Sequence, residues 1–226
     1  MKSFAIIPAA GKGKRSGFAI PKQYVKFGGK ELIVYTLEVF QRNKSVDEII
    51  IAAHPDYFAM LEKIKKKYKL TKISKIVKGG KERQDSVYNA LKSIDAGKND
   101  LIAVHDAARP LLSQKILTDA IITASKKGNA LVCVKARDTL IKGTDVVDKY
   151  IDREEAFYVQ TPQVFRYNDL MRAMETAYAA DFYATDESML IKNLGLRINL
   201  VEGSLSNFKV TTQDDIDFLR KCLKSK

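Results

Sequence analysis

The chain has 226 residues, and its 39 basic and 27 acidic side chains give a formal net charge of +12. With 46% hydrophobic and 29% charged residues, it has the composition of a globular protein and not of a disordered chain. No apolar run approaches the roughly 20 residues of a membrane span, and the first residues lack the apolar segment of a signal peptide. We therefore expect a cytoplasmic protein with a single domain over residues 1–226.

Buried strands and amphipathic helices alternate over the first 136 residues. The pattern predicts strands at 4–9, 48–54, 72–77, 100–104 and 130–136, and helices at 31–43, 57–68, 83–94 and 113–128. Continuous apolar strands separated by helices are typical of an α/β fold with a mainly parallel sheet covered on both faces. In such sheets, ligands bind beyond the carboxyl ends of the strands.

The alternation of strands and helices ends after residue 136. The pattern of residues 137–153 indicates two short strands around the turn sequence KGTD, which predicts a projecting β-hairpin. Helices are then expected at 167–181 and 185–195, and extended segments at 196–203 and 207–210. A closing helix is expected to follow Thr212, which is a suitable N-cap residue.

The loop after the first strand is rich in glycine and in basic residues. In AIIPAAGKGKRSGFAIPKQY, residues 5–24, no acidic residue accompanies the lysines and arginine. The dinucleotide pattern G-x-G-x-x-G fails because Ser16 stands at the third glycine position, and the P-loop spacing fails as well. Glycines that admit an anion to the backbone, with cations nearby, still indicate phosphate binding. A tight turn with incidental surface lysines is the structural alternative.

A second candidate segment is VHDAARP, which follows the predicted strand ending near Val104. Asp106 then lies at the same sheet edge as the glycine loop, so Asp106 and Lys22 are expected to face one site. A carboxylate beside phosphates suggests Mg²⁺, although Asp106 alone could equally cap a turn. We interpret His105 as a packed or orienting residue, and no zinc-binding motif accompanies it.

Three other features have structural explanations of their own. Lys209, placed in a predicted short strand, could be an ordinary surface lysine, and Arg153 could form an exposed salt bridge. The lysines between residues 61 and 83 fall mostly on the outer face of a predicted helix. A solvated face is therefore favoured over a nucleic-acid interface, and the aromatic residues of a single-strand binder are lacking. Cys133 and Cys222 lie in apolar patterns and are expected to be reduced thiols.

Several motifs together carry a family resemblance. In chain order they are PAAGKGKR, PKQY, GGKERQDSV, VHDAARP, ARDT, QTPQVF, TDE and VEGSLSNFKVT. This series resembles the 2-C-methyl-D-erythritol 4-phosphate cytidylyltransferases of non-mevalonate isoprenoid synthesis. The resemblance implies a Rossmann-like nucleotidyltransferase domain and a β-arm, at about residues 137–153, that joins a homodimer. It also implies a Mg²⁺-dependent reaction of CTP with methylerythritol phosphate, giving a CDP-linked product and pyrophosphate.

The resemblance also assigns roles to individual residues. Arg15, Lys22 and Lys209 are expected to bind phosphates and stabilise the charge of the transition state, and Asp106 to serve the metal and the acceptor. The residues implied for the cytidine nucleotide are Ala9, Ala10, Gly11, Gly13, Gly80 and Ser86. Thr139 and Arg153, from the arm of the partner subunit, are implied for methylerythritol phosphate together with Thr185.

Two alternatives remain open at this point. A ribitol 5-phosphate cytidylyltransferase would share the loop, the lysine and the aspartate. Such relatives more often have LAGG and HDAVRP where this chain has PAAG and HDAARP, which favours methylerythritol phosphate. The second alternative is a basic nucleic-acid-binding protein, which would bind in a strongly salt-dependent manner without metal-dependent turnover.

Overall fold

The computed structural model describes residues 1–11, 18 and 20–224, and it confirms the predicted α/β sheet. Within these residues, seven strands form one sheet in the order β11-β7-β10-β6-β1-β4-β5. All neighbouring strands are parallel except β10, which is antiparallel to β6 and β7. The sheet strands are β1 (Ser3–Ala9), β4 (Glu48–Ala53), β5 (Ile73–Lys78), β6 (Leu101–Val104), β7 (Asn129–Lys135), β10 (Phe157–Arg166) and β11 (Leu200–Glu202).

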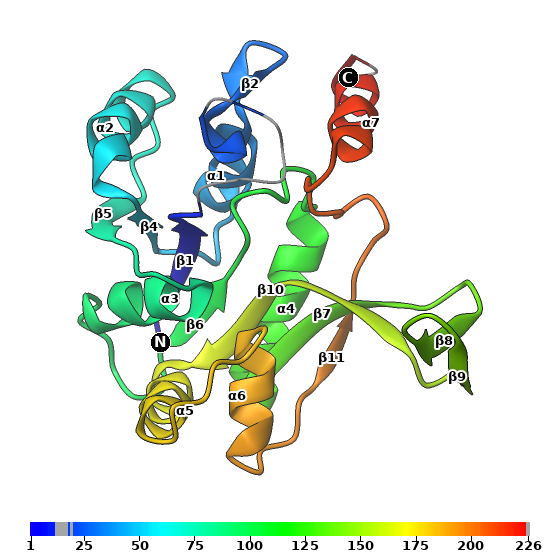
Figure 1. Cartoon of the computed structure of the whole chain (residues 1–226). Helices are drawn as coiled ribbons and strands as arrows, with labels where there is room; N and C mark the ends of the chain where they lie inside the picture. Colours follow the sequence, from blue (N-terminus) through cyan, green and yellow to red (C-terminus); the bar gives the residue numbers. More distant parts are fainter. Residues whose placement is uncertain (12–17, 19, 225–226) are drawn as a thin grey trace.

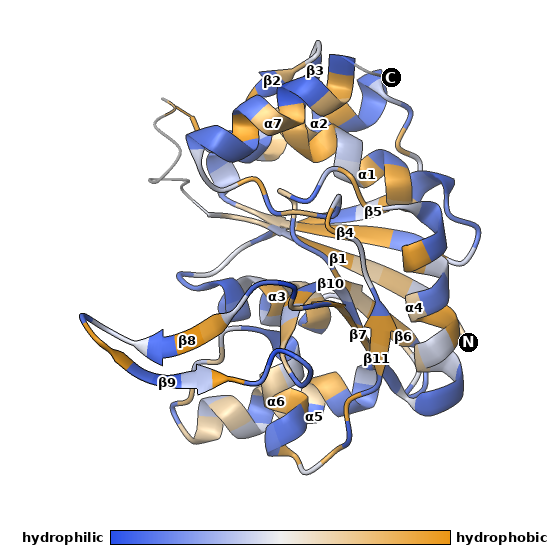
Figure 2. Ribbon diagram, turned by 90° about the vertical axis from the view of Figure 1, so that its right-hand side faces the viewer, coloured by the Kyte–Doolittle hydropathy of each residue, from blue (hydrophilic) through white to orange (hydrophobic). Residues whose placement is uncertain are grey.

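Helices cover both faces of this sheet, and alternate residues of β1 show why. Ile7 faces one core, which includes side chains of α1, α2 and α4, while Ile6 faces the other core, formed with α3, α5 and α6. In Figure 2, α1 and α2 lie on one side of the sheet and α5 and α6 on the other. The helices are α1 (Leu32–Arg42), α2 (Phe58–Lys67), α3 (Arg83–Lys92), α4 (Gln114–Lys127), α5 (Tyr167–Ala179), α6 (Glu187–Asn193) and α7 (Gln213–Lys224).

One strand was not predicted and one predicted strand was wrong. Strand β10 has no counterpart among the predicted elements, and it contains Pro162, a residue that is unfavourable inside a sheet. Pro162 is accommodated where the pairing with β7 is irregular, between Val159 and Gln163. The predicted strand at 207–210 is instead a loop. Its contact with the main body includes a hydrogen bond that the Val210 N–H donates to the Ala108 carbonyl, at 2.9 Å.

The predicted hairpin is present as β8 (Leu140–Gly143) and β9 (Val147–Ile151), an antiparallel pair. It projects from the body on the side opposite α2 (Figure 1). Its apolar side chains are open to solvent, with Val146 73% and Tyr150 72% exposed. A hairpin that projects with apolar side chains uncovered is typical of an interaction surface.

The closing helix α7 begins where the sequence predicted. Thr212 Oγ1 accepts a hydrogen bond from the Asp215 N–H, and the Asp215 carboxylate accepts one from the Thr212 N–H. Ile216 and Leu219 then pack in a third apolar cluster with Phe27, which belongs to a small hairpin of β2 (Lys26–Phe27) and β3 (Lys30–Glu31). Among the described residues, no helix is long and apolar enough to span a membrane.

Candidate active site

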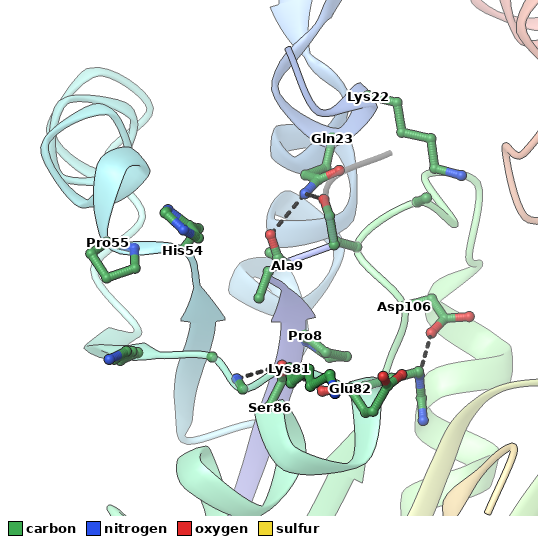
Figure 3. Close-up of a pocket in the computed structure, with 18 of the residues that line it drawn as sticks. Pro8, Ala9, Lys22, Gln23, His54, Pro55, Lys81, Glu82, Ser86 and Asp106 are labelled. Atoms are coloured by element: carbon green, nitrogen blue, oxygen red, sulfur yellow. Dashed lines mark hydrogen bonds and ion pairs between the residues drawn. The ribbon is translucent and has the colours of Figure 1, made fainter. Parts of the chain in front are cut away.

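A pocket of about 940 Å³ opens at the carboxyl ends of β1, β4, β5 and β6, where an α/β sheet binds its ligands. Figure 3 shows Lys22 and Asp106 on one side of it and His54 and Pro55 on the other. The pocket brings together most of the predicted site: Ala9, Ala10, Gly11, Lys22, Gly80, Ser86, Asp106 and Lys209 all line it. Segments from the beginning, middle and end of the chain therefore meet in one place.

The loop after β1 is held from the side by Gln23, the third residue of PKQY. Its amide Nε2 donates to the carbonyl oxygens of Ala9, at 2.7 Å, and of Gly11, at 2.9 Å. These bonds hold the segment from Ala9 to Gly11 and place the neighbouring Lys22 at the pocket. Arg15 and Gly13, which were also predicted for this site, lie outside the described residues.

The loop after β5 approaches the first loop so closely that it requires glycine. A Cβ at Gly79 would lie 2.3 Å from the Cβ of Ala10, and a Cβ at Gly80 would lie 2.0 Å from that of Asp85. The Gly80 N–H donates to Ser86 Oγ at 3.0 Å. This hydrogen bond directly joins two of the residues that were predicted to contact the nucleotide. Backbone groups packed this closely form the kind of surface to which a nucleotide can bind.

Asp106 stands at the centre of a charged cluster. Its Oδ1 lies 3.1 Å from Arg83 Nε, and its Oδ2 lies 3.0 Å from Lys209 Nζ and 3.5 Å from Arg109 Nε. Burial alone would raise the pKa of Asp106, but these cations outweigh it and hold that pKa well below its usual value. The Asp106 side chain therefore orders three cationic groups, which is a role different from the turn cap that its sequence context also allowed.

This arrangement bears on the predicted metal role of Asp106. Both of its oxygens already face positive groups, and a divalent cation placed on them would meet those groups at close range. In the part of the chain that the structure describes, no cluster of three or more acidic, histidine or cysteine side chains is arranged to hold a metal. The protein groups around Asp106 thus do not fit a metal ion bound directly to this carboxylate.

His105 is fully buried and makes hydrogen bonds within the protein, as expected of an orienting residue. Its Nε2 lies 3.2 Å from the Arg109 carbonyl, which can only accept, so Nε2 carries the proton. Its Nδ1 then accepts from Thr161 Oγ1 at 2.9 Å, and Thr161 Oγ1 in turn accepts from the Asp106 N–H. Through Thr161 and Arg109, the neutral ring fixes the loop that carries Asp106.

The burial of His105 predicts a pH dependence of stability. Burial lowers the pKa of His105 from 6.5 to about 4, and its hydrogen bond to Arg109 only partly opposes this. Between pH 6.5 and 4, His105 is therefore protonated in the unfolded chain but neutral in the folded one. The free energy of unfolding is highest above pH 6.5 and decreases as the pH falls toward 4. The expected loss is roughly 3 kcal/mol over this interval. Glutamine does not titrate, so the unfolding free energy of His105→Gln, measured by urea denaturation, should not show this decrease between pH 6.5 and 4. A decrease equal to that of the wild type would contradict the prediction.

Three residues predicted for the acceptor do not line the pocket. Thr139 and Arg153 flank the hairpin of β8 and β9 and are exposed, and Thr185 is exposed just before α6. Arg153 Nε lies 3.9 Å from Glu154 Oε1, so the exposed salt bridge that the sequence allowed is present. The acceptor roles of these three residues stay predictions.

The sequence interpretation assigned no role to Arg83, Arg109 or Glu187. Arg83 lines the pocket and binds both Asp106 and Glu187, while Arg109 donates from Nη1 to the Asn207 carbonyl at 2.7 Å. All three lie inside motifs that carried the resemblance, namely GGKER, HDAARP and TDE. The sequence shows that each of these motifs carries charged residues, but their pairing is evident only from the structure.

Comparison with known proteins agrees with this geometry. The family model for 2-C-methyl-D-erythritol 4-phosphate cytidylyltransferase matches residues 3–224. A relative of that name from Geobacter metallireducens is 40% identical over all of this chain and 99% of its own length, and one from Clostridioides difficile is 40% identical over 96% and 92%. The crystal structure of 4-diphosphocytidyl-2C-methyl-D-erythritol synthase from Anaerococcus prevotii superimposes with a TM-score of 0.86 at 30% identity, covering 99% of this chain and 96% of the other. The chain belongs to the 2-C-methyl-D-erythritol 4-phosphate cytidylyltransferase family.

Proposed function

We propose that the protein transfers CMP from CTP to 2-C-methyl-D-erythritol 4-phosphate, giving 4-diphosphocytidyl-2-C-methyl-D-erythritol and pyrophosphate. The observation that carries this proposal is the convergence of Lys22, Asp106 and Lys209 on one pocket edged by close-packed glycine loops. The family to which the chain belongs supports the choice of substrates.

The chemistry needs positioning and charge stabilisation more than it needs a nucleophilic side chain. A phosphate oxygen of the acceptor attacks the α-phosphorus of CTP, a new P–O bond forms, and the bond to the β-phosphate breaks as its electron pair leaves with pyrophosphate. The attacking oxygen is already anionic at neutral pH, so no general base is required. The structure is consistent with a reaction that uses no histidine base, because His105 is fully buried and does not line the pocket.

Lys22, Lys209 and Arg83 supply positive charge where the negative charge accumulates. Asp106 holds Lys209 and Arg83 in fixed positions, so these cations do not have to be ordered when the reaction occurs. We propose that Arg15 joins them on the triphosphate. The glycine loops, with Gly80 and Ser86, would hold the cytidine through the main chain, together with Ala9, Ala10, Gly11 and Gly13.

We propose that Mg²⁺ enters with CTP and is coordinated by phosphate oxygens and water, as this cation commonly is in nucleotide sites. When bound there, it would neutralise charge on the triphosphate. Since the oxygens of Asp106 are paired with cations, Asp106 would act on the metal through water and not as a direct ligand. We also propose a cytoplasmic site of action, which agrees with the absence of a disulfide among the described residues.

The acceptor site is proposed to be completed by a second subunit. Thr139 and Arg153 lie on the arm, outside the pocket of their own chain, and the arm carries exposed Val146 and Tyr150. We propose that two arms interlock in a homodimer and bring these residues to the partner's site. Thr185 would contact the acceptor from within the same chain.

An aspartate substitution on the arm should separate the subunits. The double variant Val146→Asp, Tyr150→Asp is expected to weaken association by about 2 kcal/mol or more, because apolar and aromatic side chains dominate such contacts. Sedimentation equilibrium and pyrophosphate release should then show a monomer with reduced turnover. The matched control is Ile122→Asp, at another exposed apolar residue, on α4. An arm variant that stays dimeric and active would refute the arm interface.

The proposed reaction is tested by supplying each acceptor in turn. Pyrophosphate release from CTP is expected with methylerythritol phosphate and Mg²⁺, and is expected to be far slower with ribitol 5-phosphate. Faster turnover of ribitol 5-phosphate would assign the chain a different acceptor. No turnover with either acceptor, together with RNA binding that weakens steeply with salt, would instead favour the nucleic-acid alternative.

A further inference from the structure

A buried carboxylate outside the pocket lining has no role assigned to it in the reaction proposed above. Glu187 is the first residue of α6 and is only 1% exposed. Both of its oxygens accept hydrogen bonds from Arg83 Nη1, at 2.6 and 2.8 Å. An ionised carboxylate is stable at such a depth only when it is paired, so the position of Arg83 and that of Glu187 depend on each other.

Arg83 extends this pairing to the pocket. Its Nε donates to Asp106 Oδ1 at 3.1 Å while Nη1 binds Glu187, and the planar guanidinium keeps these two groups at a fixed angle. Asp106 in turn binds Lys209 at 3.0 Å. The four side chains thus form a line of alternating charge, from α6 through the first residue of α3 to the loop near the end of the chain.

The start of α3 is also joined by hydrogen bonds to residues 178–184, which precede α6. Gln84 Nε2 donates to the Phe182 carbonyl at 3.2 Å, and its Oε1 accepts from the Ala184 N–H at 2.9 Å. The Tyr178 hydroxyl donates to Asp85 at 2.6 Å. These contacts hold the start of α3, next to the loop of Gly79 and Gly80, against the end of α5 and the connection that carries Thr185. Arg83 lies directly before Gln84 and Asp85, and its side chain reaches Asp106.

We infer that Glu187 is a positioning residue for cytidylyl transfer: through Arg83 it sets the position of Asp106 and Lys209, and it couples the loop of Gly79 and Gly80 to the connection that carries Thr185. This inference rests on the proposed function and extends it. Glu187 does not line the pocket, so its effect on the reaction passes through Arg83.

The test is a double-mutant cycle with Arg83→Gln, Glu187→Gln and the double variant. Glu187→Gln keeps the shape of the side chain and removes its charge. It is expected to lower kcat by about tenfold or more, since displacing groups at the reacting centre costs rate steeply. The KM for CTP should change little, because the pocket keeps all its cations. In the Arg83→Gln background, adding Glu187→Gln should cost no further activity.

Two controls separate positioning from folding. Glu38→Gln also removes a carboxylate from a partly buried ion pair, with Lys30 at 2.6 Å, but it lies outside the pocket and should leave kcat unchanged. Unfolding midpoints of all variants show whether a loss of activity follows a loss of structure. If Glu187→Gln does not fold, the activity of the double variant is compared with that of Arg83→Gln alone. The double variant removes both charges of the Arg83–Glu187 pair, so neither is left buried without its partner.

The outcomes are distinct. Loss of kcat on Glu187→Gln that disappears in the Arg83→Gln background supports the inference, as does equal activity of Arg83→Gln and the double variant. Wild-type kcat in Glu187→Gln, or the same fold-loss in both backgrounds, overturns it. Failure of the proposed function would appear separately, as wild-type protein that releases no pyrophosphate with methylerythritol phosphate.

Discussion

Lys22→Ala is expected to lower the rate of cytidylyl transfer by about 100-fold or more, the scale seen when one preorganised charge-stabilising group is removed. Lys22 lines the pocket beside the first glycine loop, and the hydrogen bonds of Gln23 to Ala9 and Gly11 fix its backbone. The loss should fall mainly on kcat, because the other pocket cations still attract CTP. Pyrophosphate release at saturating substrates measures this directly.

Lys26→Ala is the matched control for that experiment. Lys26 is four residues further along the chain, is exposed, and does not line the pocket. It should therefore retain nearly wild-type activity. If Lys22→Ala stayed within a few-fold of wild type, or if both variants lost activity equally, Lys22 would have no specific part in the transition state. Arg15→Ala is expected to show a loss of the same order as Lys22→Ala.

Asp106→Asn is the second change with a large expected effect. Asparagine keeps the size of the side chain but presents an uncharged group to Arg83, Lys209 and Arg109. Leaving these cations without their common partner should lower the free energy of unfolding by about 3 kcal/mol. It should also lower kcat about 100-fold, because Lys209 is no longer held in place. Affinity for CTP should not fall, since the pocket becomes more positive.

The stability effect of Asp106→Asn has a defined pH dependence. The cations hold the pKa of Asp106 below its usual value, so its contribution is present above the unfolded pKa near 3.8 and is lost as pH falls through the lower folded value. The difference in unfolding free energy between wild type and Asp106→Asn should thus be constant near neutral pH and shrink only below about pH 4. A difference that shrank between pH 7 and 5 would contradict this account.

Local patterns in the sequence determined most of the fold. Apolar runs such as that of β1 and periodic helices such as α1 depend on residues close together in the chain, and the structure confirms both. The rule that parallel strands end at one edge correctly placed Lys22 and Asp106 at the same pocket. The motif series, from PAAGKGKR to NFKVT, was enough to predict the family.

Only the tertiary structure decided which groups pair around the reacting centre. Strand β10 became possible because β6 and β7 offered partners on both sides and a bulge accommodated Pro162, which no local pattern reveals. The pairing of Arg83 with Glu187 joins residues 104 positions apart in sequence, and the approach of Lys209 to Asp106 likewise depends on how the loops pack. Local sequence fixes which segments are helix or strand, whereas the partners of a charged side chain depend on which distant segments the folded sheet brings together.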